Sequence, residues 1–487
     1  MMEGDAVADA AIEPRHIARA YFRTETASHR LVVVSNRVTT RAHARPDSGG
    51  LAVAIRAALQ HNGGIWFGWS GEIHDAASDD LQITAEGPLT FATLDLSKKD
   101  FDEYYIGYAN RVLWPLFHFR PSLVQFSRRD LAGYLRVNRT FARVLSPMLS
   151  PHDLVWVHDY HLIPLGEELR KLDRTEPIGF FLHIPFPAAE LLRVMPNHRE
   201  LIRSFCAYDL VGFQTQSDLD GFRDYLLRWA GGEELRPGVL RAFGRIVRAQ
   251  VFPIGIDVAT VSALAAAADG SRHLRRLRQS LVDRVLMIGV DRLDYSKGLA
   301  ARFQAYWHLL EMHRETRGRT VLIQIAPPSR SEVPEYQEIR KTLAALAGQI
   351  NSRYGEFDWT PLRYINKSFS HAILTGFFRA SRIALVTPLR DGMNLVAKEY
   401  VASQPADDPG VLVLSCFAGA ARELAEAVIV NPFDIEGMAE AILQGLNMPL
   451  GERKERWMAM MRVLERNDIT AWRESFVRAL AATGGGW

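Results

Sequence analysis

Short apolar runs, rich in β-branched residues, alternate with helical stretches almost from one end of this chain to the other. A first series of candidate strands covers residues 31–36, 65–70, 154–159, 178–183, 210–215 and 251–256. A second series covers residues 285–290, 321–326, 383–387, 411–415 and 428–430. Strands that are apolar along their whole length and separated by helices are typical of parallel sheets covered on both faces. The pattern therefore predicts an α/β fold with two Rossmann-like domains.

The length of 487 residues is also too great for a single hydrophobic core. Pro and Gly interrupt the pattern at residues 252–257 (FPIGID), where we expect one domain to end and the next to begin. The predicted parts are an N-terminal extension at residues 1–29, a first domain at 30–256, a second domain at 257–452, and a helical segment at 453–487 that docks back on the first domain. Two such domains bring two sheet edges together across a central cleft, which suits a reaction between two bulky polar ligands.

Composition excludes several classes of protein. Apolar residues make up 48%, charged residues 23%, and the formal net charge is +2, so nothing favours binding to nucleic acid. No apolar run reaches the about 18 residues of a membrane span, and the N-terminal stretch lacks the apolar core of a signal peptide. Cys206 and Cys416 lie far apart in apolar surroundings, which favours two buried free thiols over a disulfide. We therefore expect a cytoplasmic protein that binds no membrane. Its oligomeric state, a homo-oligomer included, stays open.

Residues 388–400 (PLRDGMNLVAKEY) follow the candidate strand at 383–387 and open a helix. In an open α/β sheet, ligands bind at such junctions, and the free N–H groups at a helix start favour phosphates. Asp391 and Glu399 are placed to accept hydrogen bonds from sugar hydroxyls. The alternative is an aspartate N-cap followed by an ordinary amphipathic helix.

Residues 290–298 (VDRLDYSKG) form the corresponding loop after the first strand of the second series. Arg292 and Lys297 in this loop are two fixed cations that can hold a diphosphate and stabilise the charge that builds on it as it leaves. The alternative is a surface pair of Arg292 with Asp294 beside a solvated lysine. Because lysine is otherwise scarce in the chain, we favour the diphosphate site.

Three further strand ends carry polar side chains. His158, Asp159 and His161 suggest a metal site, but no further cluster with ligand spacing accompanies them, so we expect no metal and interpret Asp159 as a ligand of sugar hydroxyls. His183 ends the next strand, where a core histidine and a ligand are equally consistent with the sequence. Arg330 follows the strand at 321–326 and either reaches a phosphate across the cleft or is a solvated loop charge.

Aromatic side chains and glycines give weaker signals. Trp66, Trp69, Tyr105 and Trp114 are candidates for stacking on sugar rings, although a single aromatic residue belongs more often to the core. No Gly-x-Gly-x-x-Gly follows the first strand, and the later loop at residues 48–51 (SGGL) does not replace it, which argues against a nicotinamide-dependent oxidoreductase. The Asp-x-Asp pairs at 100–102 and 218–220 lie in polar helical stretches, so we interpret them as surface charge rather than a Mg²⁺–nucleotide site.

Together these motifs resemble the trehalose-6-phosphate synthase family, retaining glucosyltransferases of the GT-B type. The likeness runs from about residue 31 to about residue 468 and leaves residues 1–29 outside. It is carried, in order, by LVVVSNR, SGGLAV, WFGWSGE, DEYY, LWPLFHFR, HDYHL, IGFFLHIPFP, FPIGID, RLDYSKGL, QIAPPSR, TPLRDGMNLVAKEY and VNPFD. The resemblance implies a GT-B fold that needs no cofactor, with an acceptor-binding first domain and a donor-binding second domain facing a central cleft.

The resemblance also implies roles for individual residues. The acceptor, glucose-6-phosphate, would contact Arg37, Trp69, Tyr105 and Arg330 through its phosphate, and Trp114 and Asp159 through its sugar. The donor, a nucleoside-diphosphate glucose, would contact Gly50, His183, Arg292, Lys297, Asp391, Gly392, Met393, Asn394, Leu395, Val396 and Glu399. The catalytic residues would be Asp159, His183, Arg292, Lys297 and Asp391. Ser368 departs from the family, which commonly has His beside Phe369, so the choice of uracil, guanine or adenine stays open.

The reaction implied is the synthesis of α,α-trehalose 6-phosphate from glucose-6-phosphate and a nucleoside-diphosphate glucose, with UDP-glucose the expected donor. Retention would come from metal-independent front-face transfer rather than from a carboxylate nucleophile. One alternative is a transferase similar to glucosylglycerol-phosphate synthase, which would share the donor site. Another is a catalytically silent sugar-phosphate sensor, which would have lost donor residues that are all present here.

Overall fold

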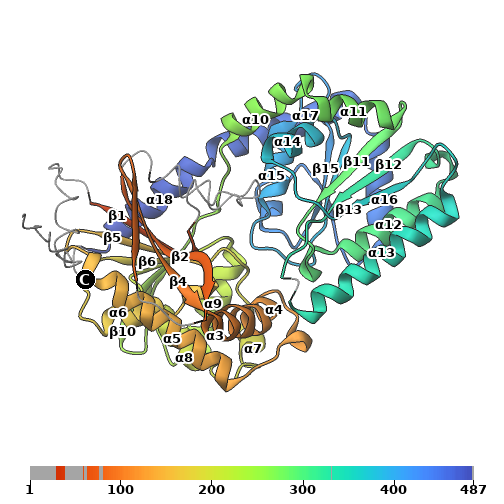
Figure 1. The fold of residues 1–487 in the computed structure, drawn as a ribbon. Coiled ribbons are helices and arrows are strands. Elements are labelled where there is room, and N and C mark those ends of the chain that lie inside the picture. The colour runs from red at the N-terminus through yellow and green to blue at the C-terminus, as the bar shows by residue number, and fades with distance from the viewer. Residues whose placement is uncertain (1–28, 39–58, 60–62, 76–79, 331, 485–487) are drawn as a thin grey trace, which may run out of the picture.

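Two β-sheets organise the structure, a computed structural model that describes residues 29–38, 59, 63–75, 80–330 and 332–484 (Figure 1). The first, sheet A, is a 10-stranded sheet and the second, sheet B, a 6-stranded sheet. From edge to edge, sheet A contains β3 (Gln82–Glu86), β4 (Leu89–Ser97), β2 (Gly64–His74), β1 (Leu31–Arg37), β5 (Leu154–His158), β6 (Ile178–Phe181), β7 (Leu210–Phe213), β10 (Arg245–Val251), β9 (Val239–Ala242) and β8 (Glu233–Arg236). Sheet B contains β13 (Leu362–Ile365), β12 (Thr320–Ile325), β11 (Val285–Val290), β14 (Ile383–Val386), β15 (Val411–Ser415) and β16 (Val428–Val430).

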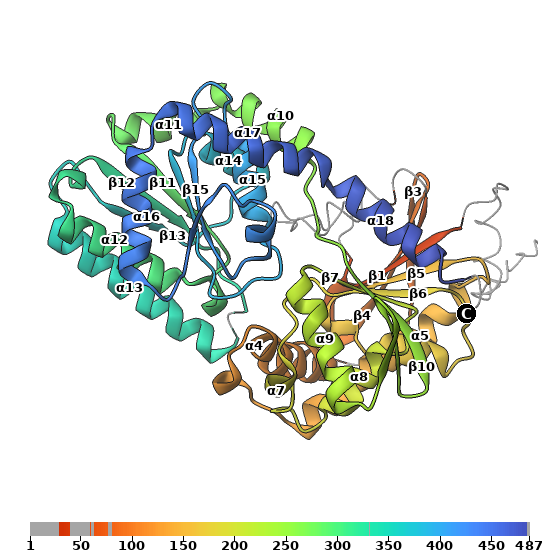
Figure 2. The same ribbon diagram turned by 180° about the vertical axis from the view of Figure 1, so that it is seen from behind.

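Helices cover both sheets. Those in the part of the chain that forms sheet A are α3 (Lys98–Asp100), the π-type helix η2 (Phe101–Leu113), α4 (Trp114–Phe117), α5 (Arg128–Leu145), η5 (Tyr160–Leu162), α6 (Leu165–Arg170), α7 (Ala189–Leu192), α8 (His198–Phe205) and α9 (Gln216–Trp229). Those that follow are α10 (Val258–Ala267), α11 (Arg272–Leu281), η7 (Tyr295–Lys297), α12 (Leu299–Met312), α13 (Pro334–Tyr354), α14 (His371–Arg379), α15 (Leu395–Ser403), α16 (Ile435–Asn447), α17 (Leu450–Arg466) and α18 (Ile469–Ala481). In the second group α12 packs on α13 and α16, whereas α10 packs on α14 and α15. The layers are visible in Figures 1 and 2.

The predicted α/β fold with parallel sheets is confirmed for sheet B and for the centre of sheet A, where β2, β1, β5, β6, β7 and β10 are paired in parallel. The edges of sheet A differ from the prediction, because β3 is antiparallel to β4, and β9 is antiparallel to both β10 and β8. The strands β3 and β8 are largely exposed, and β9 has only 4 residues, so none of them shows the long apolar run by which buried parallel strands are recognised.

The strand predicted at residues 251–256 is wrong, because the strand in this region ends where these residues begin. The strand β10 ends at Val251, and the residues after it form an extended link to α10. Pro253 has no N–H to give to a sheet, and the Ile254 N–H donates instead to Gln214 Oε1 at 3.0 Å. The Ile254 carbonyl accepts a hydrogen bond from Lys398 Nζ at 2.7 Å. Side chains of other elements therefore satisfy the backbone that a neighbouring strand would otherwise pair.

The prediction that Asp218 is a surface charge is also wrong. Its side chain forms a capping box with Thr215 at the start of α9. It also accepts a hydrogen bond from the Phe186 N–H at 2.8 Å, and the residue is only 3% exposed. Asp218 therefore fixes the loop after β6 as well as the helix that it begins.

The C-terminal helix α18 follows closely on α17 and reaches sheet A, where it contacts β5 and β7 (Figures 1 and 2). The ring of Phe476 on α18 stacks on Trp156 of β5, with 4.5 Å between the ring centroids. Gly179 and Gly212 make room for it, because a Cβ on either residue would lie 2.8 Å from the Phe476 ring. The last helix thus rests on strands that lie far from it in the sequence.

Two predictions from composition can be compared with the described residues. None of their helices combines the length and the apolar composition needed to cross a membrane. Cys206 and Cys416 are both free thiols, and Cys206 is buried as expected, but Cys416 is partly exposed, so its predicted burial is wrong.

Candidate functional site

The side chains singled out in the sequence lie at the carboxyl ends of strands in both sheets. Arg37 ends β1, and Asp159 follows β5 directly, while Arg292 follows β11 and Asp391 follows β14. The residues of sheet A and those of sheet B meet where the turn after β14 touches the end of β6. The approach is so close there that a Cβ added to Gly392 would overlap the carbonyl oxygen of His183. The carboxyl ends of parallel strands are where α/β sheets bind ligands. The fold therefore brings both sets of candidates to one interface between the sheets.

The contact at Gly392 gives a first prediction. We expect Gly392→Ala to lower the catalytic rate at least tenfold, because the added methyl group must push the turn that carries Asp391 away from His183. Gly348→Ala is the matched control: Gly348 lies inside α13 with open space around its Cβ position, so this change should leave the rate unaltered and stabilise the helix by about 1 kcal/mol. Equal rates in both variants, measured at saturating substrates, would show that the close approach has no functional role.

Lys297 and Asp391 form an ion pair with 2.6 Å between Nζ and Oδ2, and their side chains are 12% and 14% exposed. Asn394 donates a second hydrogen bond to the same carboxylate oxygen at 3.0 Å. Burial opposes the charge on Asp391, but Lys297, His118 and Asn394 together outweigh it and lower its pKa. Asn394, with a left-handed backbone, caps α15 through the Ala397 N–H. The alternative that Asp391 is a simple N-cap is therefore wrong.

Arg292 is exposed and makes no hydrogen bond or ion pair within the described part of the chain. Its guanidinium lies 5.8 Å from the centre of the Trp114 ring. The alternative of a surface pair between Arg292 and Asp294 is wrong, because Asp294 is fully buried and pairs with Arg330. Arg292 thus stands beside the interface as a cation with room for a ligand.

Arg330 is the most heavily bonded of the predicted residues. Its side chain is 6% exposed, so the alternative of a solvated loop charge is wrong. Its Nη1 donates to Asp294 at 3.0 Å and to the Tyr336 hydroxyl at 2.5 Å, and its Nη2 donates to the Tyr160 hydroxyl at 3.2 Å. The guanidinium also lies 3.8 Å above the ring of Trp114. Arg330 therefore joins sheet B to residues that follow β5 and η2.

The sequence indicated no functional role for two titratable residues beneath this interface, Asp294 and His118. Burial raises the pKa of Asp294, but Arg330, His118, Arg292 and Lys297 outweigh burial and lower it to about 2. His118 is 2% exposed, and its Nδ1 lies 2.8 Å from the Trp114 carbonyl oxygen, while burial lowers its pKa to about 4. A fully charged carboxylate and a neutral imidazole thus underlie Arg330 and Trp114. The proximity of Asp294 and His118 to Arg330 and Trp114 depends on tertiary structure, which the spacing of residues in the sequence does not reveal.

A second cluster of predicted residues lies at the end of β1 and β2. The Arg37 guanidinium is 5.6 Å from the centre of the Trp69 ring, and Trp69 is 5.9 Å from Tyr105. Tyr105, on η2, stacks in turn on His161 with 5.7 Å between centroids and 9° between the rings. The ring of His161 is 3.9 Å from that of Tyr160, which bonds to Arg330. The cluster and Arg330 are thus joined by a continuous row of aromatic rings.

Asp159 and His183 lie side by side at the ends of β5 and β6. The Asp159 carboxylate accepts a hydrogen bond from the His183 N–H at 3.2 Å, and its backbone has φ of 75°, which is rare outside glycine. Burial raises the pKa of Asp159 to about 6, although Arg330 and Arg292 act in the opposite direction. Burial lowers the pKa of His183 to about 3, so its ring is neutral near pH 7. The residue is partly exposed, which argues against a purely structural core histidine.

The remaining predicted residues are placed less decisively. Glu399, on α15, lies 3.6 Å from His371 and raises the pKa of that histidine. Ser368 is exposed, and Trp66 is a core residue whose Nε1 donates to Ser35 Oγ at 2.8 Å. Met393 is buried, and Leu395 and Val396 are partly exposed at the start of α15. Gly50 lies outside the described residues.

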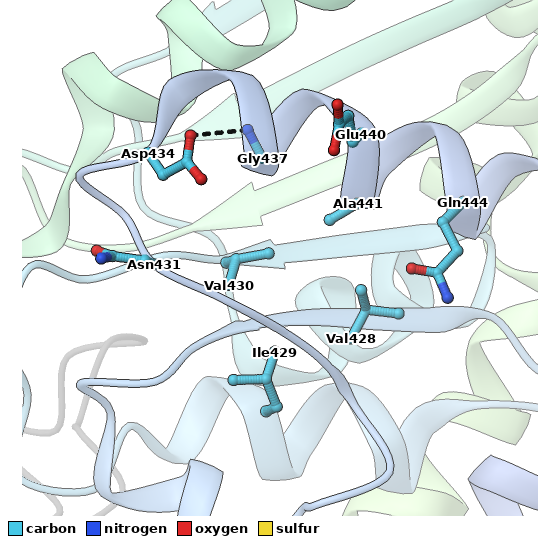
Figure 3. A pocket seen from close by; sticks show the side chains of 9 residues that line it. All are labelled: Val428, Ile429, Val430, Asn431, Asp434, Gly437, Glu440, Ala441 and Gln444. Carbon is cyan, nitrogen blue, oxygen red and sulfur yellow. Dashed lines mark hydrogen bonds between the residues drawn. The ribbon is translucent and has the colours of Figure 1, made fainter.

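Two further observations concern sites elsewhere. Within the described ranges, no group of three or more His, Cys, Asp or Glu residues is arranged to hold a metal ion. A surface pocket of about 440 Å³ lies between β16 and α16, where Asp434 accepts a hydrogen bond from the Gly437 N–H at 2.9 Å (Figure 3). None of the residues predicted to bind substrate lines this pocket, and Asp434 is already used as the cap of α16. We therefore assign the site to the interface between the sheets.

Known proteins are similar to this chain along most of its length. The sequence model of glycosyltransferase family 20 matches residues 23–482. A trehalose-6-phosphate synthase of Sinorhizobium fredii is 49% identical over 93% of this chain and 98% of its own length. Two solved structures are also similar: an α,α-trehalose-phosphate synthase (UDP-forming) from Burkholderia xenovorans in complex with glucose-6-phosphate (TM-score 0.90, 48% identity, 93% of this chain and 99% of that one), and a trehalose-6-phosphate protein from E. coli bound with UDP-2-fluoro glucose (TM-score 0.89, 46% identity, 93% and 99%).

Proposed function

The chain belongs to glycosyltransferase family 20, and on this basis we propose that it transfers glucose from UDP-glucose to glucose-6-phosphate, forming α,α-trehalose 6-phosphate and UDP. One observation carries the proposal: Arg330, which follows β12 of sheet B, lies on Trp114 and bonds to Tyr160, both of which belong with sheet A. This contact brings the candidate acceptor residues within reach of the candidate donor residues Arg292 and Lys297. The similar structures that contain glucose-6-phosphate and a UDP-glucose analogue support the choice of both substrates.

The acceptor phosphate would lie between Arg37 and Arg330, beside the rings of Trp69 and Tyr105. Arg37 is exposed at the end of β1, and its guanidinium is positioned by the Trp69 ring. Arg330 keeps its Nε free of hydrogen bonds among the described residues, so it can still donate to a phosphate oxygen while bonded to Asp294. The sugar would then lie against Trp114 and Asp159, whose carboxylate can accept hydrogen bonds from hydroxyls.

We expect Arg330→Ala to raise the KM for glucose-6-phosphate at least tenfold and to leave the KM for UDP-glucose unchanged. The change also leaves Asp294 buried without its cation, which should lower the free energy of unfolding by about 3 kcal/mol. Arg330→Lys retains the charge beside Asp294 but loses the planar fork, so it should recover most of the stability and little of the acceptor affinity. Steady-state kinetics and denaturant unfolding of both variants give these values. An equal rise in the KM of both substrates would contradict an acceptor role.

The donor diphosphate would lie against Arg292, Lys297 and the N–H groups at the start of α15. Arg292 is exposed and makes no hydrogen bond or ion pair with the described residues, which supports a role with an anionic ligand. Lys297 lies at the end of the short helix η7, and both Lys297 and Asn394 bond to Asp391. As the bond between glucose and diphosphate breaks, negative charge develops on the leaving oxygen. These groups would stabilise that charge without rearranging.

Retention of configuration would arise by attack of the acceptor hydroxyl from the side of the leaving group. A double displacement needs a free carboxylate beside the sugar. Asp391 is bonded to both Lys297 and Asn394, and Asp159 accepts the His183 N–H, which argues against either as nucleophile. The acceptor hydroxyl would instead pass its proton to a phosphate oxygen of the departing UDP. The protein's contribution is then positioning, exclusion of water and stabilisation of charge.

The raised pKa of Asp159 gives a prediction about pH. Because burial raises that pKa from the ordinary 3.8 to about 6, the side chain is protonated below about pH 6 and becomes a carboxylate as the pH rises. Ionisation of Asp159 is less favourable in the folded protein than in the unfolded one. The contribution of Asp159 to the free energy of unfolding therefore falls as the pH rises from 3.8 to about 6. Acceptor binding, which uses the carboxylate, should show the opposite trend and strengthen towards pH 7.

The measurement compares kcat/KM for glucose-6-phosphate in wild type and Asp159→Asn between pH 5 and pH 8. The phosphate of the acceptor also titrates near pH 6, but its effect is common to both proteins and cancels in their ratio. We expect the ratio of wild type to variant to rise about tenfold per pH unit below about pH 6 and to level off above it. A ratio that stays constant would show that the ionisation of Asp159 does not limit acceptor use.

The proposal is tested by release of UDP from UDP-glucose in the presence of glucose-6-phosphate or glycerol-3-phosphate. Release that depends on glucose-6-phosphate alone is the expected result. Dependence on glycerol-3-phosphate would favour an enzyme similar to glucosylglycerol-phosphate synthase. Binding of glucose-6-phosphate with no release from UDP-, GDP- or ADP-glucose would favour a sugar-phosphate sensor. The complete donor set, with Arg292, Lys297, Asp391 and Glu399 all present, argues against that last outcome.

A further inference from the structure

His158 and His183 form a pair of imidazole rings at the ends of β5 and β6. Nδ1 of His158 lies 3.0 Å from Nε2 of His183, with 5.2 Å between the ring centroids. His158 is 0% exposed, whereas His183 is partly exposed at the interface between the sheets. The sequence drew attention to His158 only as a candidate metal ligand. The structure shows it behind a residue that faces the site.

Apolar aromatic rings pack on His158. Its ring lies 4.5 Å from Trp156 and 6.3 Å from Trp472, a residue of the C-terminal helix α18. Trp472 also packs on His183, with 6.1 Å between the ring centroids. Burial and the neighbouring imidazole keep both rings uncharged, because each lowers the pKa of His158 and burial lowers that of His183. Between two neutral imidazoles 3.0 Å apart, one ring must donate the single shared proton and the other must accept it.

The second nitrogen of His158 decides which ring donates. His158 Nε2 is buried and has no hydrogen-bond partner among the described residues. If His183 donated, His158 would carry its own proton on Nε2, leaving a buried N–H without an acceptor. If His158 donates, Nε2 is an unprotonated nitrogen in an apolar cage. A buried donor without a partner is the rarer and costlier of the two arrangements.

We infer that His158 is a positioning residue that donates its Nδ1 proton to Nε2 of His183 and thereby fixes His183 in the tautomer protonated on Nδ1. The Nδ1 of His183 has no partner among the described residues, so in this tautomer it offers one N–H to a ligand. On the proposed function, on which this second step rests, the acceptor of that bond is a hydroxyl oxygen of the transferred glucose. A donor, rather than an acceptor, is therefore presented to the sugar beside the carboxylate of Asp159.

The tautomer is tested directly by ¹⁵N NMR of the protein labelled at histidine, which distinguishes protonated from unprotonated ring nitrogens. The signals of His183 are identified by their loss in His183→Asn. His198→Asn serves as the control for this identification, because His198 lies on α8 and pairs with Tyr225, so its loss should leave the signals of His183 in place. We expect a proton on Nδ1 of His183 in the unliganded wild type. A proton on Nε2 of His183 would overturn the inference, whether or not any variant folds and whatever reaction the protein catalyses.

Kinetics then test the step that involves the sugar. His158→Leu removes the donor, whereas His158→Asn places an amide N–H near the position of Nδ1. We expect kcat/KM for UDP-glucose to fall about tenfold in the leucine variant and to recover most of this loss in the asparagine variant. UDP-deoxyglucoses that each lack one hydroxyl identify the contact. For one of these analogues, the kcat/KM of wild type should fall about tenfold relative to UDP-glucose. The kcat/KM of the leucine variant should be the same with that analogue as with UDP-glucose, because its contact is already lost. Equal further losses in both proteins for every analogue would overturn the contact with glucose.

The two tests separate this inference from the proposed function. A protein with the Nδ1 tautomer but no transfer from any UDP-sugar would contradict the proposed function and leave the positioning of His183 by His158 intact. Transfer activity together with the Nε2 tautomer of His183 would support the proposed function and contradict the positioning of His183 by His158.

Discussion

Arg292→Ala is expected to lower kcat by about a hundredfold or more, because it removes a charge-assisted contact to the departing diphosphate. The same change should alter the free energy of unfolding by no more than about 0.5 kcal/mol, the range usual for exposed side chains. The structural reason is that Arg292 is exposed and has no hydrogen bond or ion pair within the described residues, and its 5.8 Å approach to Trp114 is a weak contact. Activity and stability are therefore separable at this position.

The matched control is Arg314→Ala. Arg314 is also exposed, has no ion pair among the described residues, and lies in the turn η8 (Arg314–Thr316). Its replacement changes the net charge by the same amount and should leave kcat unaltered. The measurement is kcat at saturating substrates together with unfolding in denaturant. Loss of a hundredfold in both variants would mean that net charge, rather than the position of Arg292, governs the rate. Near wild-type turnover in folded Arg292→Ala would remove this residue from the mechanism.

Lys297→Met should have a comparable effect on turnover and a larger effect on stability. It too removes a cation from the proposed diphosphate site, at a cost of about a hundredfold in kcat. In addition, Lys297 is the ion-pair partner of Asp391, with Nζ 2.6 Å from Oδ2 and both side chains largely buried. Removing one member of a buried pair leaves the other charge uncompensated, so we expect a loss of about 3 kcal/mol in the free energy of unfolding.

A double variant separates the two roles of Lys297. In Lys297→Met combined with Asp391→Asn, no buried charge is left unpaired, so most of the lost stability should return. Turnover should stay low, because the cation that stabilises the leaving group is still absent. The pH dependence supplies a further check: Lys297 helps to lower the pKa of Asp391, so the instability of the single variant should diminish as the pH falls and that carboxylate takes up a proton. Recovery of turnover in the double variant would show that Lys297 acts only as a structural partner.

Much of the fold follows from the hydrophobic pattern alone. The expected strands at 285–290, 411–415 and 428–430 coincide with β11, β15 and β16, because buried parallel strands are continuous apolar runs. The hydrophobic pattern does not predict strands that are buried on only one face. It also fails where side chains, rather than a neighbouring strand, bond to the backbone. The edge strands β3 and β8 of sheet A are largely exposed, and β9 has only 4 residues. Residues 251–256 were predicted as a strand, but the backbone of Ile254 bonds to the side chains of Gln214 and Lys398 instead.

The candidate site was predictable to the level of strand ends, and no further. Strand ends located Asp159, His183, Arg292, Arg330 and Asp391, because the carboxyl edge of a parallel sheet is fixed by topology. What each residue bonds to was not predictable. Arg330 pairs with Asp294, 36 residues away, and Lys297 pairs with Asp391, 94 residues away. The position of His158 behind His183 also depends on a tertiary contact, and the sequence indicated His158 only as a candidate metal ligand.

Transfer of glucose with retention to the anomeric hydroxyl of glucose-6-phosphate can be tested by identifying the product. The protein is incubated with UDP-glucose and glucose-6-phosphate in the presence of EDTA, and the product is analysed by NMR. We expect a non-reducing disaccharide phosphate in which two anomeric carbons, both in the α configuration, share one oxygen. A β-linked product, a reducing disaccharide, or a reaction that stops when EDTA is added would contradict it.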